Sequence, residues 1–219
     1  MSIREGVAGV RTRIAAACAR VGRSTDEVTL IAVTKVFPAA FVEEAIAAGV
    51  TDIGENRVQE ARDKKPEVAG SARWHLIGHL QSNKAKDAVR LFDVIQTVDS
   101  AALAEKIARA ADGAQKRQEV LLQVNIGDET QKSGAARSEV ESLARAIAAM
   151  PSLHLRGLMA IPPVGTAEEV RTYFRDLRVL RDAVGVEHLS MGMSEDFETA
   201  VEEGATLVRV GRAIFGERG

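Results

Sequence analysis

Residues 29–35 read TLIAVTK, a run rich in β-branched and aliphatic side chains that ends in a single lysine and is followed by Val-Phe-Pro at 36–38. A strand that is apolar along both faces is typical of a parallel sheet, in which both faces are buried. Lys35 therefore stands where a buried strand emerges into a loop, the position at which α/β proteins place ligands. Taken alone, Lys35 could equally be the solvated end of a strand.

The same order of strand, loop and helix repeats along the rest of the chain. Eight strands are predicted, at 29–35, 51–53, 73–77, 93–98, 119–126, 153–161, 186–191 and 206–210. Helices are predicted at 38–48, from a turn at 54–56 through about 68, and at 82–91, 101–111, 138–149, 167–184 and 194–203. An additional helix is predicted at 3–21, where apolar residues recur every three or four positions.

Eight strand-helix units without a long linker or a shift in composition predict a closed (β/α)8 barrel, of the TIM type, that forms a single domain over 1–219. The competing fold is an open doubly wound sheet. Its dinucleotide-binding form has a Gly-x-Gly-x-x-Gly turn after the first strand, and Lys35 to Pro38 contains no such pattern. The barrel with an extra N-terminal helix is therefore the favoured fold.

Composition narrows the classes of function. Lys and Arg number 29 against 31 Asp and Glu, so a general nucleic-acid-binding surface is not expected and any phosphate site must be local. Cys18 is the only cysteine, which excludes an intramolecular disulfide and a cysteine metal cluster, and no metal site is expected. No window approaches the roughly 20 apolar residues of a membrane span. A cytoplasmic protein is expected.

In a barrel, the residues that follow each strand share one rim. Here that rim should carry these residues: Lys35, Asn56, His79, Asp99, Asn125, Ser194 and Gly211. The most specific part is the pair of segments SMGMS (190–194) and RVGR (209–212), because barrel enzymes commonly bind phosphate between the loops after strands seven and eight. Seen singly, Ser194 could be a helix N-cap, Gly211 a turn glycine and Arg209 a surface ion-pair partner.

A lysine that faces a phosphate site across a barrel mouth suggests one ligand carrying both an aldehyde and a phosphate. Pyridoxal phosphate fits this spacing, with a Schiff base on Lys35 and the phosphate near strands seven and eight. Arg209 on strand eight would then lie near the pyridine nitrogen. Because arginine keeps its proton, it would leave that nitrogen unprotonated and weaken the ring as an electron sink.

Six segments carry a resemblance to a known family. They are AVTK (32–35), IGENRVQE (53–60), WHLIGHLQSNK (74–84), LRGLMAIPP (155–163), LSMGMSEDFETAVEEGAT (189–206) and VRVGRAIFG (208–216). Together they resemble the pyridoxal phosphate homeostasis protein family, whose barrel is similar to the alanine racemase N-terminal domain. The resemblance implies cofactor on Lys35, Asn56 at the ring hydroxyl side and Arg209 at the ring nitrogen. It also implies Ser194 and Gly211 at the phosphate, with Arg212 nearby.

The resemblance implies a protein that holds pyridoxal phosphate reversibly and buffers or delivers it, with apo forms of pyridoxal phosphate enzymes as candidate partners. A monomer is expected, because the second domain that dimerises racemases is not expected here. The alternative is a pyridoxal phosphate-dependent amino acid racemase, which needs two bases. In related racemases one base is a tyrosine from a further domain, which is not expected here. Tyr173 and His75 are predicted to be structural, and His79 to act in the cofactor shell or fix a loop rather than to catalyse. An aldolase using Lys35 on its substrate is a third, less favoured, alternative.

Overall fold

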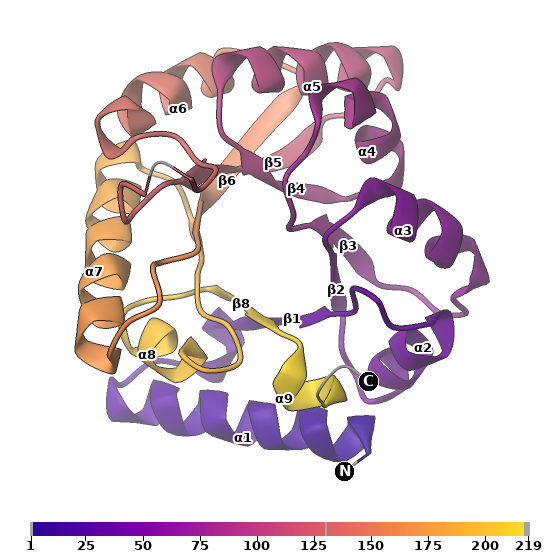
Figure 1. Ribbon diagram of the computed structural model, residues 1–219, viewed down its shortest axis with the longest axis vertical. Coiled ribbons are helices and arrows are strands. Elements are labelled where there is room, and N and C mark those ends of the chain that lie inside the picture. Colours follow the sequence, from indigo (N-terminus) through magenta and orange to yellow (C-terminus); the bar gives the residue numbers. More distant parts are fainter. Residues whose placement is uncertain (1, 130, 217–219) are drawn as a thin grey trace.

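The computed structural model describes residues 2–129 and 131–216, and within them eight parallel strands close into a barrel. Each strand pairs with the next one along the chain, and the last pairs with the first, as Figure 1 shows. The strands are β1 (Thr29–Val33), β2 (Asp52–Glu55), β3 (Arg73–Leu76), β4 (Val94–Val98), β5 (Gln118–Val124), β6 (Leu153–Ala160), β7 (His188–Ser190) and β8 (Leu207–Val210). The predicted (β/α)8 barrel is confirmed.

Helices surround the barrel on its outside (Figure 1). They are α1 (Ile3–Arg20), α2 (Ala39–Ala47), α3 (Val58–Lys64), α4 (Ala85–Leu91), α5 (Ala101–Gly113), α6 (Val140–Ala148), α7 (Ala167–Val184), α8 (Phe197–Glu202) and α9 (Arg212–Phe215). Local sequence fixes their ends. In α7, Thr166 and Glu169 form a reciprocal capping box at the first turn, and Gly185 takes a left-handed conformation (φ 74°) that closes the last.

The predicted N-terminal helix is present and completes the outer layer. Because α9 is a single turn, α1 packs across both α8 and α9 beside the seam where β8 meets β1 (Figure 1). Gly6 permits this approach, since a Cβ there would lie 2.6 Å from the Ile214 carbonyl oxygen on α9. Cys18 is buried on α1, as part of the larger apolar core.

Two apolar cores hold the layers together. The larger lies between the strands and the surrounding helices. The smaller lies inside the barrel and consists of Ile31, Val94, Leu121, Met159 and Leu207. Side chains alternate across a strand, so residues two positions further along the same strands also face the interior, nearer the mouth. Three of these positions, Val33, Ile161 and Arg209, line the pocket at the mouth.

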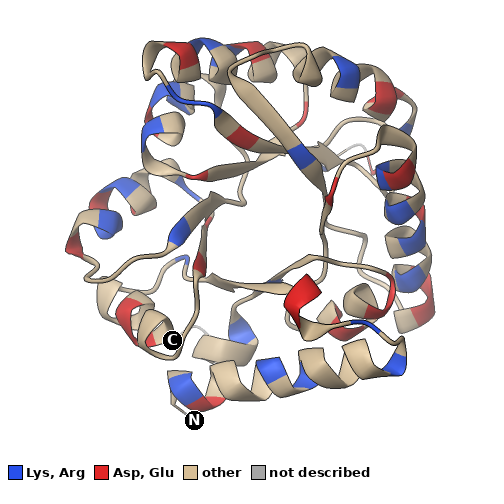
Figure 2. Cartoon of the chain, turned by 180° about the vertical axis from the view of Figure 1, so that it is seen from behind, with Lys and Arg blue, Asp and Glu red and all other residues tan. Residues whose placement is uncertain are grey.

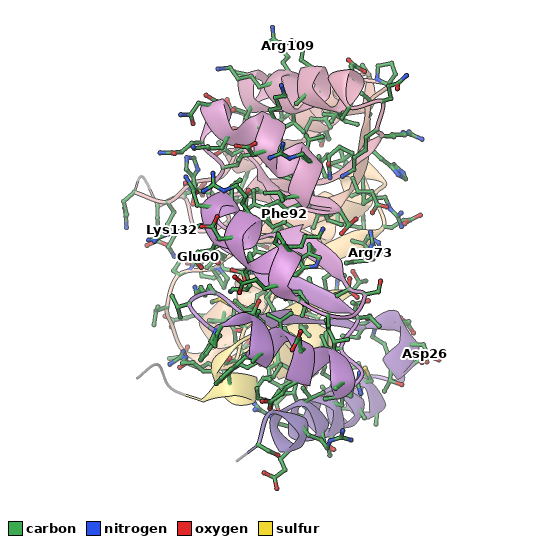
Figure 3. The ribbon with its side chains drawn as sticks, turned by 90° about the vertical axis from the view of Figure 1, so that its right-hand side faces the viewer. Asp26, Glu60, Arg73, Phe92, Arg109 and Lys132 are labelled. Atoms are coloured by element: carbon green, nitrogen blue, oxygen red, sulfur yellow. The ribbon has the colours of Figure 1, made fainter. Side chains whose placement is uncertain are left out.

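The mouth and the floor of the barrel lie on opposite sides of the molecule. In the side view of Figure 3, Glu60 and Lys132 lie toward the mouth, whereas Arg73, the first residue of β3, and Asp26, which precedes β1, lie toward the floor. Figure 2 shows basic and acidic residues interspersed over the helices. Among the described residues, no helix combines the length and the apolar character needed to cross a bilayer.

Several element boundaries differ from the prediction by a few residues, and two of these differences bear on the site. Residue 55 was expected in a turn, but β2 continues to Glu55, whose carboxylate is fully buried and accepts hydrogen bonds from Thr34 Oγ1 (2.7 Å) and Lys64 Nζ (2.6 Å). The eighth helix was expected from Ser194, but α8 begins at Phe197, and Ser194 bonds to the next loop instead of capping the helix. In both cases a distant partner overrides the local signal.

Candidate functional site

A pocket at the C-terminal mouth of the barrel brings together all six predicted site residues. It is lined by Val33, Lys35, Asn56, Ile77, Ile161, Met193, Ser194, Glu195, Asp196, Arg209, Gly211 and Arg212. We call it the mouth pocket. Its cavity of about 250 Å³ is slightly smaller than the roughly 300 to 1,000 Å³ that ligand pockets span. It therefore suits a small ligand that carries several polar groups.

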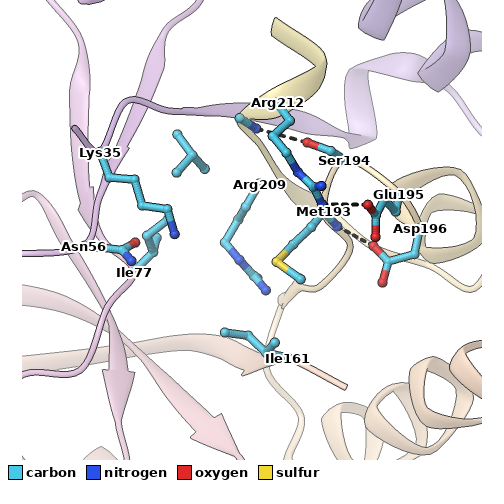
Figure 4. A pocket seen from close by; sticks show the side chains of 12 residues that line it. Lys35, Asn56, Ile77, Ile161, Met193, Ser194, Glu195, Asp196, Arg209 and Arg212 are labelled. Carbon is cyan, nitrogen blue, oxygen red and sulfur yellow. Dashed lines mark hydrogen bonds and ion pairs between the residues drawn. The ribbon is translucent and has the colours of Figure 1, made fainter. Parts of the chain in front are cut away.

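Lys35 lies in a tight turn on one side of the mouth pocket. The Phe37 amide donates to the Thr34 carbonyl oxygen (3.1 Å) across this turn, and Val36 has a φ of 65°, which is rare for a β-branched residue. In Figure 4 the Lys35 side chain extends into the pocket beside Asn56 and Ile77. The turn thus aims the half-buried lysine amine into the cavity.

A buried ion pair supports the turn from behind. Lys64 Nζ donates to the Thr34 carbonyl oxygen (2.7 Å) and to Glu55 Oε1 (2.6 Å), and it is almost fully buried. Burial raises the pKa of Glu55 against these hydrogen bonds, which favour its ionised form. Thr34 precedes Lys35 and Glu55 precedes Asn56, so one cluster fixes the strand ends that carry both site residues.

Ser194 lies across the pocket from Lys35 (Figure 4), and Gly211 lines the same pocket. Ser194 Oγ accepts long hydrogen bonds from the amides of Gly211 and Ala213, each 3.4 Å. The hydroxyl and the two amides therefore converge on one small region of the pocket wall. Backbone amides and a hydroxyl arranged in this way can bind an oxyanion such as a phosphate.

Arg209 forms the floor of the mouth pocket. The residue is 3% exposed; its guanidinium donates through Nη1 to Ser190 Oγ (2.6 Å) and through Nη2 to the Ala160 carbonyl oxygen (2.9 Å). Burial lowers its pKa to about 10, partly offset by the charge of Asp196. That value still leaves Arg209 protonated at neutral pH. It presents a fixed positive charge to the centre of the cavity (Figure 4).

The remaining charged residues of the pocket have partners at its edge. Arg212 donates to Glu195 Oε1 (2.7 Å), and both side chains are exposed. Asp196 Oδ1 accepts from the Met193 amide (2.6 Å), and burial raises its pKa. Arg212 therefore lies at the rim near Ser194 (Figure 4), free of the deep burial that fixes Arg209.

Other predicted rim residues are not in the mouth pocket. His79 and Asn125 line a neighbouring cavity together with Lys132, and His79 lies 4.0 Å from Asp99. His75 is buried and bonded on both ring nitrogens, as its predicted structural role requires. Tyr173 packs, partly buried, against the core. The predicted rim is thus divided between two cavities.

Sequence reasoning missed several parts of the site. The apolar lining residues Ile77, Ile161 and Met193 were not selected; Ile77 and Ile161 could have been found from their positions at strand ends. It also missed the carboxylates Glu195 and Asp196, which looked like an ordinary helix start. Within residues 2–129 and 131–216, no three His, Cys, Asp or Glu side chains are grouped closely enough to hold a metal ion.

Comparisons with known proteins agree with this geometry. The family model for the alanine racemase N-terminal domain matches residues 11–219. The pyridoxal phosphate homeostasis protein of Pseudomonas aeruginosa is 43% identical over 221 residues, which cover 99% of this chain and 96% of that protein. The protein of the same name from Escherichia coli K12 is 43% identical over 232 residues, covering 99% and 97%.

Solved structures resemble this one over nearly all of its length. PipY of Synechococcus elongatus, solved with pyridoxal phosphate bound, is 38% identical, with a TM-score of 0.88 over 98% of this chain and all of PipY. Alanine racemase of Streptomyces lavendulae is 20% identical, with a TM-score of 0.71 over 95% of this chain and 57% of the racemase, and shares the barrel fold. The chain therefore belongs to the pyridoxal phosphate homeostasis protein family, on the barrel of the alanine racemase N-terminal domain.

Proposed function

We propose that this protein binds pyridoxal 5'-phosphate as a Schiff base on Lys35 and takes part in pyridoxal phosphate homeostasis by buffering or delivering the cofactor. The observation that carries the proposal is the single pocket in which a lysine amine, a buried arginine and a set of oxyanion donors face one another. The names of the relatives and the cofactor bound in PipY support it.

The pocket residues fit the groups of this cofactor. When bound, the cofactor supplies an aldehyde, which condenses with the neutral Lys35 amine to form the C=N bond and release water. Ser194 Oγ and the Gly211 amide would bind the phosphate, with Arg212 adding charge at the rim. Asn56, beside Lys35, would donate to the ring hydroxyl. Arg209, between these two ends, would face the ring nitrogen.

A carrier role is favoured over catalysis by the groups around Lys35. No tyrosine, histidine or cysteine is among the described residues that line the mouth pocket. Its two carboxylates are engaged at the rim, Glu195 with Arg212 and Asp196 with the Met193 amide. Arg209 also disfavours ring protonation, which weakens the ring as an electron sink. Exchange of the Schiff base needs neither a second base nor a protonated ring.

Lys35 variants test the covalent assignment. Lys35→Ala should abolish the visible absorbance of the conjugated Schiff base and the label fixed by borohydride, while the barrel stays folded. Lys35→Arg keeps the positive charge but lacks the condensing amine, so it should lose both signals as well. Mass spectrometry of the reduced protein locates the label. A pyridoxyl label that persists at the mouth pocket in Lys35→Ala would overturn the assignment.

Delivery of the cofactor is tested by offering it to an enzyme that requires pyridoxal phosphate. Cofactor-loaded protein is mixed with an apo form of a pyridoxal phosphate enzyme, and recovery of that enzyme's activity is followed against free cofactor at the same concentration. A delivery role is supported if the activity of the recipient enzyme recovers at least as fast as dissociation of the cofactor from this protein allows. No recovery over many half-lives of Schiff base exchange would limit the protein to storage.

The racemase alternative has its own readout. In deuterated water, enzyme-like exchange of the α-proton of alanine, on the order of 1 per second or faster, would overturn the carrier proposal. Arg209→Glu should raise that exchange per bound cofactor, because a carboxylate stabilises a protonated ring nitrogen. Absence of exchange in both forms would mean that a positioned base is lacking.

A further inference from the structure

A chain of hydrogen-bonded polar side chains crosses the inside of the barrel beneath the mouth pocket. It begins at Arg209 on β8, passes through Ser190 on β7, Gln96 on β4 and His75 on β3, and ends at Asp52 on β2. Their exposed fractions are 5% or less. Of the five, Arg209 alone lines the pocket.

The level of this chain in the barrel is set by strand alternation. Leu207 and Val94, which belong to the small apolar core, lie two residues before Arg209 and Gln96. Ile77 and Gly211, which line the pocket, lie two residues after His75 and Arg209. The chain therefore runs downward from Arg209 at the ligand cavity to His75 and Asp52, which pair in register with Val94 and Ile31 of the small apolar core.

Each hydrogen bond in the chain can point in one direction only. Arginine has no acceptor, so Arg209 Nη1 donates to Ser190 Oγ at 2.6 Å. The serine hydroxyl then donates its one proton to Gln96 Oε1, also at 2.6 Å. This orients the Gln96 amide so that its nitrogen faces the imidazole of His75.

The other half of the chain agrees with that direction. Gln96 Nε2 donates to His75 Nδ1 at 2.9 Å, which leaves the ring proton on Nε2 for Asp52 Oδ1 at 2.8 Å. Asp52 also accepts from Thr51 Oγ1 at 2.7 Å. Burial opposes ionisation of Asp52, but the hydrogen bonds from His75 and Thr51 outweigh it and keep its pKa below the ordinary value.

A contribution to folding stability does not explain why these polar side chains lie inside the barrel. Barrel interiors are filled mainly by bulky branched apolar side chains, and replacing buried polar groups by apolar ones of similar volume is often neutral or stabilising. What the chain does provide is orientation. Arg209 forms no ion pair within the described part of the chain, so Ser190 and the Ala160 carbonyl determine how its guanidinium lies.

We propose that Ser190, Gln96, His75 and Asp52 are positioning residues that hold the Arg209 guanidinium in the orientation that reads the ring nitrogen of the ligand. This inference rests on the proposed cofactor. The polarised chain connects the positive charge of Arg209 to the carboxylate of Asp52 across the barrel, and hydrogen bonds in such a chain strengthen one another. The ring nitrogen is thus recognised by residues that never touch the ligand.

The test compares pyridoxal phosphate with its 1-deaza analogue, in which a C–H group replaces the ring nitrogen. Wild-type protein should prefer pyridoxal phosphate on the order of tenfold to a hundredfold, as a hydrogen bond to a charged group predicts. Arg209→Leu should remove most of this preference. Gln96→Leu and Ser190→Ala should reduce it at least about threefold, although neither residue contacts the ligand.

Gln123→Leu is the matched control. Gln123 is a buried glutamine on β5 that donates to the Ser133 carbonyl oxygen (3.0 Å) and lies outside the chain. Its replacement removes a comparable buried amide, so it should lower the unfolding midpoint to a similar extent while the preference for the ring nitrogen stays at the wild-type value. A preference in Gln96→Leu that equals the wild-type value would overturn the inference.

A second measurement needs no cofactor and covers the case in which a variant fails to fold. Nitrogen-15 NMR of the cofactor-free wild-type protein should find His75 protonated on Nε2, with Nδ1 unprotonated. The opposite tautomer would overturn the one-way chain. Failure of the proposed function would look different, because no Schiff base would form with pyridoxal phosphate or its analogue while the His75 tautomer remained as expected.

Discussion

At the residue scale, the pocket divides recognition of a phosphorylated aldehyde between separate side chains. Lys35 supplies the amine and Arg209 the central charge, while Ser194 lies across the cavity from Lys35 (Figure 4) and bonds to the Gly211 amide. A Cβ at Gly211 would lie 3.4 Å from the carbonyl oxygen of Val33, which also lines the pocket, so the backbone accommodates a side chain at this position. Phosphate recognition is therefore separable from Schiff base formation.

Ser194→Ala combined with Gly211→Val should weaken pyridoxal phosphate binding by about 2 to 4 kcal/mol, because one donor is lost and approach to the backbone amides is blocked. Pyridoxal, which lacks the phosphate, should lose far less affinity. Fluorescence or absorbance titration with both ligands measures the difference. Equal losses would show that these residues do not bind the phosphate.

At the scale of elements, α1 links the start of the chain to the phosphate side of the site. It packs on α9, whose first residues follow Gly211, and Gly6 allows the contact. Gly9 lies on the same helix, but a Cβ there would meet no atom within 4 Å. Substitution of these two glycines by alanine therefore distinguishes the effect of helix propensity, which both share, from the effect of packing against α9, which only Gly6 has.

Gly6→Ala should lower stability by about 1 to 3 kcal/mol, because the added Cβ forces α1 away from Ile214. Gly9→Ala should instead raise it by up to about 1 kcal/mol, since alanine favours the helix. Guanidinium unfolding measures both. Similar changes of one sign in the two variants would mean that the α1–α9 contact is not tight.

At the scale of the whole molecule, two buried carboxyls at the two ends of β2, Asp52 and Glu55, have pKa values shifted in opposite directions. The pKa of Asp52 is lowered, because hydrogen bonds from His75 and Thr51 outweigh its burial. Such a group stabilises the fold above its unfolded pKa, about 3.9 for aspartate, and this contribution is lost as pH falls through the folded value. Burial raises the pKa of Glu55, so its contribution decreases as pH rises through its folded value.

Asp52→Asn should therefore be less stable than wild type at pH 6, and the difference should narrow at about pH 3. Unfolding midpoints at several pH values measure it. Asp26→Asn, at an exposed position before β1, is the control and should change the midpoint little at either pH. A deficit in Asp52→Asn that stays constant down to pH 3 would contradict the expected titration.

The sequence by itself determined the barrel and the principal site residues. Runs such as TLIAVTK and the helical stripe at 3–21 are periodic over a few residues, and that periodicity reports which faces are buried. Strand-end positions then located Lys35, Asn56 and Gly211 at one rim, because all strands of a parallel barrel end on the same side. The local sequence pattern was enough to predict a helix or strand wherever the same face was buried along its whole length.

Only the tertiary structure decided which rim residues share a cavity and what holds them. His79 follows a strand as Asn56 does, yet it lines a different cavity, because strand register and side-chain direction determine where each points. Glu55 belongs to β2 only because Lys64 and Thr34 meet it there. The chain from Arg209 to Asp52 spans 157 positions in sequence and exists only once β8 closes against β1, since contacts between distant strands leave no periodic signal in the sequence.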